Sequence, residues 1–153
     1  MANTYTQLYV QLVFAVKGRQ YLVKESFREE LEKVICGIAS NHECKVFAIY
    51  CNPDHTHIFL SFKPTTALSK LVEQVKSGSS KWINQRKLIV GRFSWQKGFG
   101  AFTYSKSQTD RVVKYILNQP EHHKKQSFKD EYLSLLKKFE IDYNQNYLFK
   151  WYD

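Results

Sequence analysis

The sequence predicts an α+β fold in which helices cover one face of an antiparallel sheet. Three observations support this prediction: strand-like and helix-like segments alternate along the chain, two of the strands form a short hairpin, and no internal repeat interrupts them. The 153 residues have the length of one ordinary domain. We therefore expect a single domain over residues 1–153, in which residues 140–153 form an aromatic C-terminal tail.

The first half of the chain is expected to form three strands and one helix. Residues 5–16 are rich in Tyr, Val, Leu and Phe with partial alternation, which is typical of a strand. A capping box that begins at Ser26 precedes apolar residues at helical spacing. Residues 44–51 and 55–62 then read as two antiparallel strands joined by a turn at Pro53.

The next segment is expected to form a second helix and a fourth strand. Thr65 or Thr66 is placed to cap the helix, whose apolar residues again recur at helical spacing. Residues 98–105 have the composition of a strand.

Two further helices are expected near the C-terminus. Ser107 with Asp110 starts the first of them, and Pro120 ends it because the residue before a proline disfavours the helical conformation. Ser127 is placed to cap a final helix over residues 128–139. The resulting order of strand, helix, strand, strand, helix and strand is that of a ferredoxin-like (RRM-like) unit, followed by C-terminal helices. One sheet face would then be left free for a ligand.

The charge of the chain favours a polyanionic partner. Lys and Arg number 23 against 14 Asp and Glu, a net charge of +9. Such an excess binds nucleic acid by releasing counterions from its phosphates, and the alternative is a basic surface that only aids solubility.

The sequence also predicts a soluble, cytoplasmic protein. No apolar run approaches the roughly 18 residues that a membrane helix needs, and the N-terminus does not resemble a signal peptide. Cys36, Cys44 and Cys51 are odd in number and lack metal-site spacing, so we expect reduced thiols.

Two histidines in the predicted hairpin are candidate metal ligands. His55 and His57 lie two residues apart on one strand, so both side chains point to the same face, about 6.6 Å apart along the chain. Two imidazoles in this arrangement can bind one divalent ion. The alternative is a pair of exposed strand histidines without a ligand.

A tyrosine and a glutamine form the second candidate pair. Tyr115 and Gln119 lie four residues apart on a predicted helix, so they share one helical face and can supply a nucleophile and a metal ligand. Tyr104 and Gln108 have the same spacing, but Tyr104 falls in a predicted strand, and we discount that pair. The alternative for Tyr115 is an ordinary half-buried helix residue.

Several segments together resemble the HUH single-tyrosine transposases of small bacterial insertion sequences, the IS200-like family. The resemblance rests on five segments in the same order, over roughly residues 5 to 125. These segments are residues 9–20 (YVQLVFAVKGRQ), 52–60 (NPDHTHIFL), 69–81 (SKLVEQVKSGSSK), 94–101 (SWQKGFGA) and 115–119 (YILNQ).

The resemblance implies a DNA transposase that cleaves and rejoins single-stranded DNA. Tyr115 would form a 5′-phosphotyrosine link, and His55, His57 and Gln119 would bind Mg²⁺ or Mn²⁺. It also implies a bacterial homodimer in which the tyrosine helix acts in trans, on single-stranded ends that carry hairpins. Thr56 departs from the bulky aliphatic residue that usually separates the two histidines.

Six basic residues are candidates for phosphate contacts, with a solvated basic face as the alternative. They lie on and after the second helix and beside the tyrosine: Lys76, Lys81, Arg86, Lys87, Arg111 and Lys114.

Two other functions compete with the transposase. One is a non-catalytic single-stranded nucleic-acid-binding module on the same sheet, although the chain lacks an RNP1 pattern. The other is a metal carrier, which would need more clustered ligands than we expect here, because His122 and His123 are predicted to face solvent.

Overall fold

The computed structural model describes residues 3–18 and 21–151 of the chain. Its sheet is antiparallel with the strand order β2-β3-β1-β4, and β5 also pairs with β1. The five strands are β1 (Tyr9–Lys17), β2 (Lys45–Cys51), β3 (His55–Ser61), β4 (Ser94–Trp95) and β5 (Gly100–Thr103). The predicted α+β class, with its antiparallel sheet, is confirmed.

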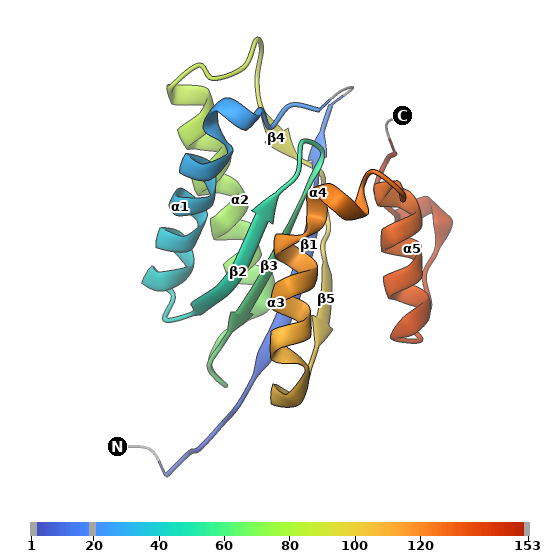
Figure 1. The fold of residues 1–153 in the computed structure, drawn as a ribbon. Helices are drawn as coiled ribbons and strands as arrows, with labels where there is room; N and C mark the ends of the chain where they lie inside the picture. Colours follow the sequence, from blue (N-terminus) through green and yellow to red (C-terminus); the bar gives the residue numbers. More distant parts are fainter. Residues whose placement is uncertain (1–2, 19–20, 152–153) are drawn as a thin grey trace.

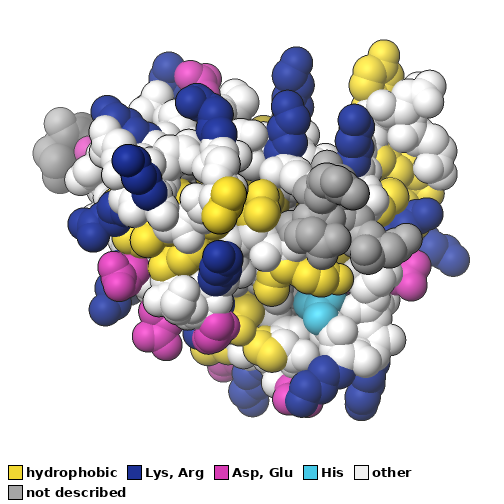
Figure 2. Space-filling model, turned by 90° about the horizontal axis from the view of Figure 1, so that it is seen from above, with side chains coloured by type: hydrophobic (Ala, Val, Ile, Leu, Met, Phe, Trp, Pro, Cys, Tyr) yellow, Lys and Arg dark blue, Asp and Glu magenta, His cyan; other side chains and the backbone are white. Residues whose placement is uncertain are grey.

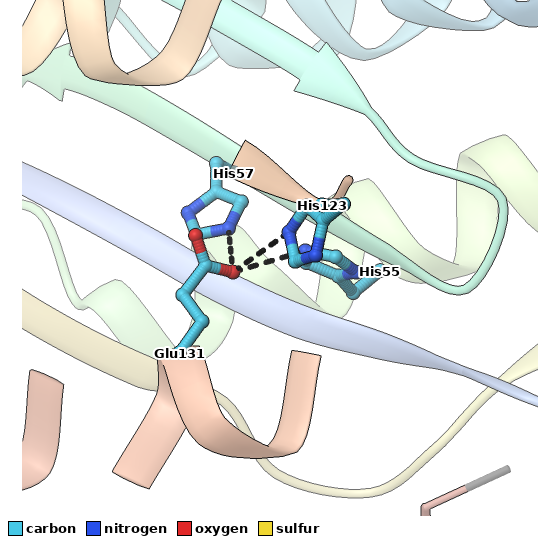
Figure 3. A group of neighbouring side chains, drawn as sticks. All are labelled: His55, His57, His123 and Glu131. Atoms are coloured by element: carbon cyan, nitrogen blue, oxygen red, sulfur yellow. Dashed lines mark hydrogen bonds and ion pairs between the residues drawn. The ribbon is translucent and has the colours of Figure 1, made fainter. Parts of the chain in front are cut away.

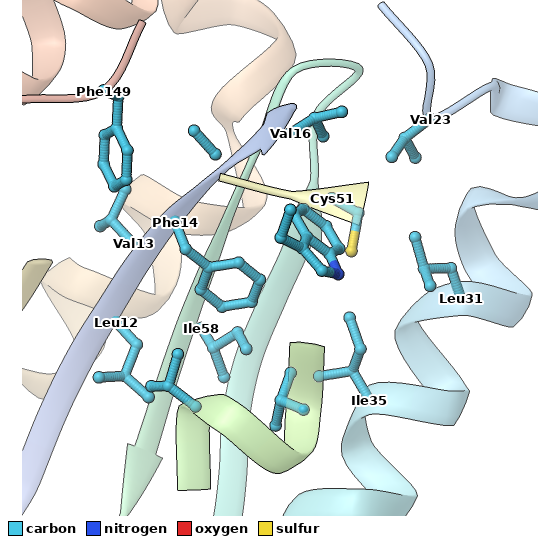
Figure 4. Packing of buried hydrophobic residues seen from close by; sticks show 14 of the residues in the cluster. Leu12, Val13, Phe14, Val16, Val23, Leu31, Ile35, Cys51, Ile58 and Phe149 are labelled. Atoms are coloured by element: carbon cyan, nitrogen blue, oxygen red, sulfur yellow. The ribbon is translucent and has the colours of Figure 1, made fainter. Parts of the chain in front are cut away.

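Two long helices cover one face of the sheet, as the sequence predicts. They are α1 (Glu25–Asn41) and α2 (Leu68–Gln85), which pack against each other and lie side by side in Figure 1. Beneath them, Phe14 is fully buried and meets Trp95 edge to face, with 4.8 Å between ring centroids. Figure 4 shows this core, in which Phe14 lies among Leu12, Ile58 and the side chains of α1.

The opposite face of the sheet is not left free, which corrects the expectation above. The helix α3 (Thr109–Leu117) lies across β2 and β3, and its Val112 and Ile116 pack on Phe59. The helix α5 (Phe128–Lys138) lies beside it, and Tyr132 meets Phe102 of β5 edge to face. This second layer closes over the functional residues of β3.

Helix starts were the least accurate of the sequence predictions. The first residue before α1 is Lys24, so Ser26 lies inside the helix and forms no cap. Ala67 precedes α2, because Thr66 uses its hydroxyl to accept the backbone N–H of Lys63 in the preceding turn. Ser127 does cap α5, and its hydroxyl accepts the backbone N–H of Asp130.

The segment before α3 also differs from the prediction. The capping box is formed by Ser105 and Gln108, not by Ser107 and Asp110, and it opens a 3₁₀ turn (Lys106–Gln108) that leads into α3. The two-residue strand β4 was not predicted because so short a segment carries no alternation.

The helix expected to carry both Tyr115 and Gln119 is divided in two. It ends at Leu117, and Gln119 opens the separate short helix α4 (Gln119–His122). Pro120 lies in the first turn of α4, where its missing N–H leaves no hydrogen bond unmade. The proline therefore lies in the first turn of a new helix, which begins at Gln119 directly after Asn118.

The aromatic tail packs only in part. Phe149 and Trp151 lie against Tyr132 and Phe128 of α5, at centroid distances of 4.9 Å and 5.4 Å respectively. Tyr143 and Tyr147 are exposed, and Tyr152 lies outside the described residues. The short turn Gln145–Tyr147 connects these segments.

All three cysteines are free, as predicted. Among the residues that the structure describes, none of the helices combines the length and the apolar character that a membrane crossing requires.

Candidate metal and tyrosine site

The two histidines of β3 point to the same face of the sheet, as strand geometry requires. In the register with β1, His55 is paired with Ala15 and His57 with Val13, and the two imidazole centroids are 5.0 Å apart. Both side chains are buried, and they contact rings from α3, α5 and the turn after α4. Phe128 of α5 stacks on His55 at 3.8 Å and holds the ring in place.

A third histidine and a glutamate complete a four-residue cluster with this pair. Glu131 comes from the first turn of α5, and His123 follows α4 (Figure 3). Glu131 Oε1 lies 3.2 Å from His55 Nε2, 3.0 Å from His57 Nε2 and 3.1 Å from His123 Nε2. The expectation that His123 faces solvent is therefore wrong; its side chain is 20% exposed.

The orientation of the three imidazoles is what a metal site requires. Each Nδ1 faces an oxygen that can only accept, and in a neutral ring with its proton on Nδ1 the Nε2 atom keeps its lone pair and directs it at Glu131 Oε1. The oxygens are Asp54 Oδ1 for His55 (2.7 Å), Gln11 Oε1 for His57 (2.7 Å) and the Gln126 backbone carbonyl for His123 (2.9 Å). Metal-binding histidines in proteins are held by such outer hydrogen bonds, so this donor set fits a divalent cation.

Tyr115 and Gln119 both reach this cluster although they lie in different helices. The Tyr115 hydroxyl donates to Glu131 Oε2, and Gln119 Nε2 donates to the same oxygen at 2.9 Å. The amide oxygen of Gln119 accepts from Asn52 at 3.0 Å and lies 2.9 Å from His123 Nε2. The structure thus brings the tyrosine, the glutamine and the two strand histidines of one chain together.

Burial and ion pairing shift the pKa values in this site. Burial lowers the pKa of His57, whereas hydrogen bonds to Asp54 and Glu131 outweigh burial at His55 and raise its pKa. Burial alone would raise the pKa of the Glu131 carboxyl, yet the histidines hold it well below its usual range. Burial and the neighbouring carboxylate raise the pKa of Tyr115. At neutral pH the site therefore contains a carboxylate beside a protonated phenol.

Two cavities border the cluster. One, of about 270 Å³, is lined by Tyr115 and Glu131 and by the basic side chains of Arg111 and Lys138. The other, of about 300 Å³, reaches His123 and is bordered by Trp151, Lys129 and Lys150 among its lining residues. Figure 2 shows a face on which Lys and Arg side chains surround hydrophobic side chains and a histidine lies in a hollow.

The six candidate phosphate contacts lie in two places. Arg111 and Lys114 are exposed on α3, and Arg111 borders the cavity at Tyr115. Lys81, Arg86 and Lys87 are exposed on and after α2, in the other layer of the fold. Lys76 donates to the carbonyls of Gln96 and Gly98 at 2.8 Å and 2.7 Å, and burial lowers its pKa to about 8. Its ammonium group is thus already hydrogen-bonded within the protein.

The order and geometry of these residues agree with one known family. The sequence model of the family described as Transposase IS200 like matches residues 4–119. The chain belongs to this family. The match covers the hairpin with both histidines, Tyr115 and Gln119, and it ends before His123 and Glu131.

Individual relatives agree with this assignment. The IS200-like chain is 25% identical over 118 residues to the ISDra2 transposase TnpA of Deinococcus radiodurans, across 74% of this chain and 84% of the relative. Its fold matches the crystal structure of a protein described as a transposase from Deinococcus radiodurans, with a TM-score of 0.61 and 20% identity. That match covers 78% of this chain and 96% of the other.

A second solved structure has the same fold. It is a REP-associated tyrosine transposase bound to a REP hairpin, with a TM-score of 0.60 and 14% identity. The match covers 80% of this IS200-like transposase and 74% of the other chain. At these identities the two structures show a shared fold for this chain.

Sequence reasoning missed Glu131 and misplaced His123. Glu131 lies in the first turn of an amphipathic helix, where an acidic residue is favoured for its interaction with the helix dipole alone. One signal was available: residue 131 falls on the buried side of the helix, next to Tyr132 and one turn after Phe128. Because a charged residue is rarely buried without a partner, this position indicates that Glu131 pairs with another polar or charged group in the core.

Proposed function

We propose that this transposase cleaves and rejoins single-stranded DNA through a covalent link to Tyr115. The observation that supports this is the position of the Tyr115 hydroxyl. It bonds to one oxygen of a carboxylate whose other oxygen meets His55 and His57. The nucleophile thus lines a cavity together with Glu131, the carboxylate that both strand histidines contact.

The reaction we propose is a transesterification. Tyr115 Oη attacks the scissile phosphorus, and the bond from phosphorus to the 3′ oxygen of the preceding nucleotide breaks. The phenol loses one proton and the 3′ oxygen gains one, so the products are a 5′-phosphotyrosine and a free 3′ hydroxyl. Because one phosphodiester replaces another, attack by a 3′ hydroxyl on this link joins strands without ATP.

The proposed cofactor is a divalent cation, Mg²⁺ or Mn²⁺, held by His55, His57 and Gln119. When bound, it would withdraw charge from the scissile phosphate and favour attack by a phenol that is a poor nucleophile at neutral pH. The protein's own contribution is to exclude water around a buried histidine pair and to hold the tyrosine hydroxyl beside it.

The proposed DNA partner is a single strand that carries a hairpin. The net charge of +9 supports a polyanionic ligand, and a transposase of the same fold is bound to a REP hairpin. Arg111 and Lys114, which precede Tyr115 on α3, are proposed to bind the phosphates on either side of the scissile bond.

The test is a denaturing gel of the protein with labelled single-stranded DNA from the flanks of its own gene. With Mn²⁺ or Mg²⁺ we expect a band of DNA linked to protein, and with EDTA we expect none. DNA that is shifted on a native gel but never linked under any metal condition would instead support the non-catalytic binding module.

We also propose the homodimer that the family resemblance implies, with Tyr115 acting on the histidine pair of the other subunit. In the single chain, Tyr115 already lies 5.9 Å from its own His57, measured between ring centroids. Exchange between subunits would therefore have to break the contacts of Tyr115 and Gln119 with Glu131.

A mixture of two inactive variants tests the exchange. Tyr115→Phe and His57→Ala subunits are unfolded together, refolded as a mixture and assayed for the covalent product. If the tyrosine acts in trans, half the dimers are mixed and each has one intact site, so roughly a quarter of wild-type activity returns. If no activity returns although mixed dimers form, each subunit uses its own tyrosine.

A further inference from the structure

Glu131 is the residue of this site that the family pattern does not account for. Its side chain is 2% exposed, and it is the only acidic residue buried to this degree in the two ranges that the structure describes. A buried carboxylate is unfavourable unless another group compensates its charge. Within the described chain, its ion-pair partners are three histidines, with neither Lys nor Arg among them.

We propose that Glu131 and His123 bind the same divalent cation as His55 and His57. This inference deepens the proposed function and rests on it. The four ligand atoms lie within 4.8 Å of one another, and Glu131 Oε1 occupies the point at which the three Nε2 atoms converge. A cation there needs ligand distances of about 2.0–2.2 Å, so the carboxylate withdraws when the ion binds, and the imidazoles, which lie 3.0–3.2 Å from Glu131 Oε1, close by roughly 1 Å.

The hydrogen bonds around the four side chains favour a bound cation over a cluster that has only a structural role. When each imidazole is neutral and carries its proton on Nδ1, the three Nε2 atoms and Glu131 Oε1 are all acceptors directed at one point. If hydrogen bonds alone held these atoms together, several of the imidazoles would have to be protonated. Positive charges would then lie within a few ångströms of each other, which is unfavourable. A single divalent cation satisfies all four acceptors and compensates the buried carboxylate.

The second carboxylate oxygen extends the role of Glu131 to the tyrosine. Oε2 accepts the Tyr115 hydroxyl and the Gln119 amide, while Oε1 faces the histidines. One side chain therefore joins the ion to the nucleophile, and Glu131 is also a positioning residue for Tyr115. The segment after residue 119, which lies beyond the family match, supplies two of the ligands.

The proposed donor set also distinguishes between metals. Mg²⁺ prefers oxygen ligands and retains water, whereas imidazole nitrogens favour transition metals. A site that adds a third imidazole and a carboxylate to His55, His57 and the Gln119 amide should therefore select Mn²⁺ over Mg²⁺. We expect that Mg²⁺ at the same concentration displaces little bound Mn²⁺.

The experiment is a Mn²⁺ titration of the full-length protein after removal of metals with EDTA, with free Mn²⁺ followed by electron paramagnetic resonance. Glu131→Gln keeps the shape of the side chain and removes its charge, and His123→Gln removes one imidazole. Asp130→Asn is the matched control, because it removes an exposed charge from the neighbouring position of α5. His57→Ala shows how much Mn²⁺ binding is lost when one of the two β3 histidines is removed. Melting curves without metal show which variants fold.

We expect Glu131→Gln to weaken Mn²⁺ binding by more than the roughly 10–100-fold that loss of an outer-shell partner costs. His123→Gln should weaken it as well, and Asp130→Asn should bind as the wild type does. Mn²⁺ should raise the melting temperature of wild type and Asp130→Asn but not of Glu131→Gln.

The outcomes separate this inference from the proposed function. In one outcome, Glu131→Gln and His123→Gln fold and bind Mn²⁺ at least as tightly as wild type, while His57→Ala loses binding. Glu131 and His123 are then not ligands, and a metal site at His55 and His57 remains supported. If the wild type itself binds no Mn²⁺, both the inference and the metal-dependent function are wrong.

Discussion

The Tyr115→Phe protein is expected to bind hairpin DNA and to form no DNA–protein link. Phenylalanine keeps the ring that packs beside His57, and it removes only the oxygen that would attack phosphorus. Loss of a covalent nucleophile should reduce product by at least about a thousandfold. The measurement is the denaturing gel with Mn²⁺, together with a native gel that shows binding is retained.

Tyr104→Phe is the matched control for this prediction. Tyr104 borders the same cavity, is partly buried, and has a glutamine four residues later, as Tyr115 does. Its hydroxyl accepts a hydrogen bond from Gln11 at 2.8 Å and makes no contact with Glu131 that the structure records. We expect the linked product to persist in this variant. A product that survives Tyr115→Phe and disappears in Tyr104→Phe would reassign the nucleophile.

The largest effect on stability is expected at Phe14. This side chain is fully buried between the sheet and the α1–α2 layer, and its ring meets Trp95 edge to face (Figure 4). Phe14→Ala removes the ring and leaves a cavity, which typically costs about 3–5 kcal/mol. Since a domain has only about 5–15 kcal/mol of stability in total, the variant should be close to unfolding at room temperature.

Urea unfolding followed by circular dichroism measures this loss. Val90→Ala serves as the control, because Val90 is 97% exposed and its substitution should change the free energy of unfolding by less than about 0.5 kcal/mol. A Phe14→Ala protein that unfolds within about 1 kcal/mol of wild type would mean that the core collapses around the lost ring.

The sheet and the histidine pair could be predicted because their signals are local. Alternation along 44–51 and 55–62 indicates a hairpin, and the i, i+2 spacing of His55 and His57 alone places both on one face. Helix starts were less predictable, although Ser26 and Thr66 are both residue types that cap helices. Ser26 lies inside α1 and forms no cap, and the Thr66 hydroxyl accepts from Lys63 in the preceding turn.

The other half of the cluster could not be predicted because it depends on how distant elements pack. Glu131 follows His57 by 74 residues, and nothing in the sequence between them states that α5 folds back over β3. Pro120 predicted the end of a helix, and α3 does end before it at Leu117, but the sequence did not indicate that the proline also opens a new turn, which brings His123 back to the site. Only the tertiary structure brings these side chains together.

The position of α5 also has a consequence for biosynthesis. A ribosome makes the chain from its N-terminus, and the strands with His55 and His57 can pair before α5 has been made. The cluster of His55, His57, His123 and Glu131 cannot assemble until α5 emerges and docks, because Glu131 lies on that helix. If these residues bind the ion together, an unfinished chain can carry every residue of the family pattern and still lack two of its metal ligands, so the nascent protein has no competent site until α5 has been made.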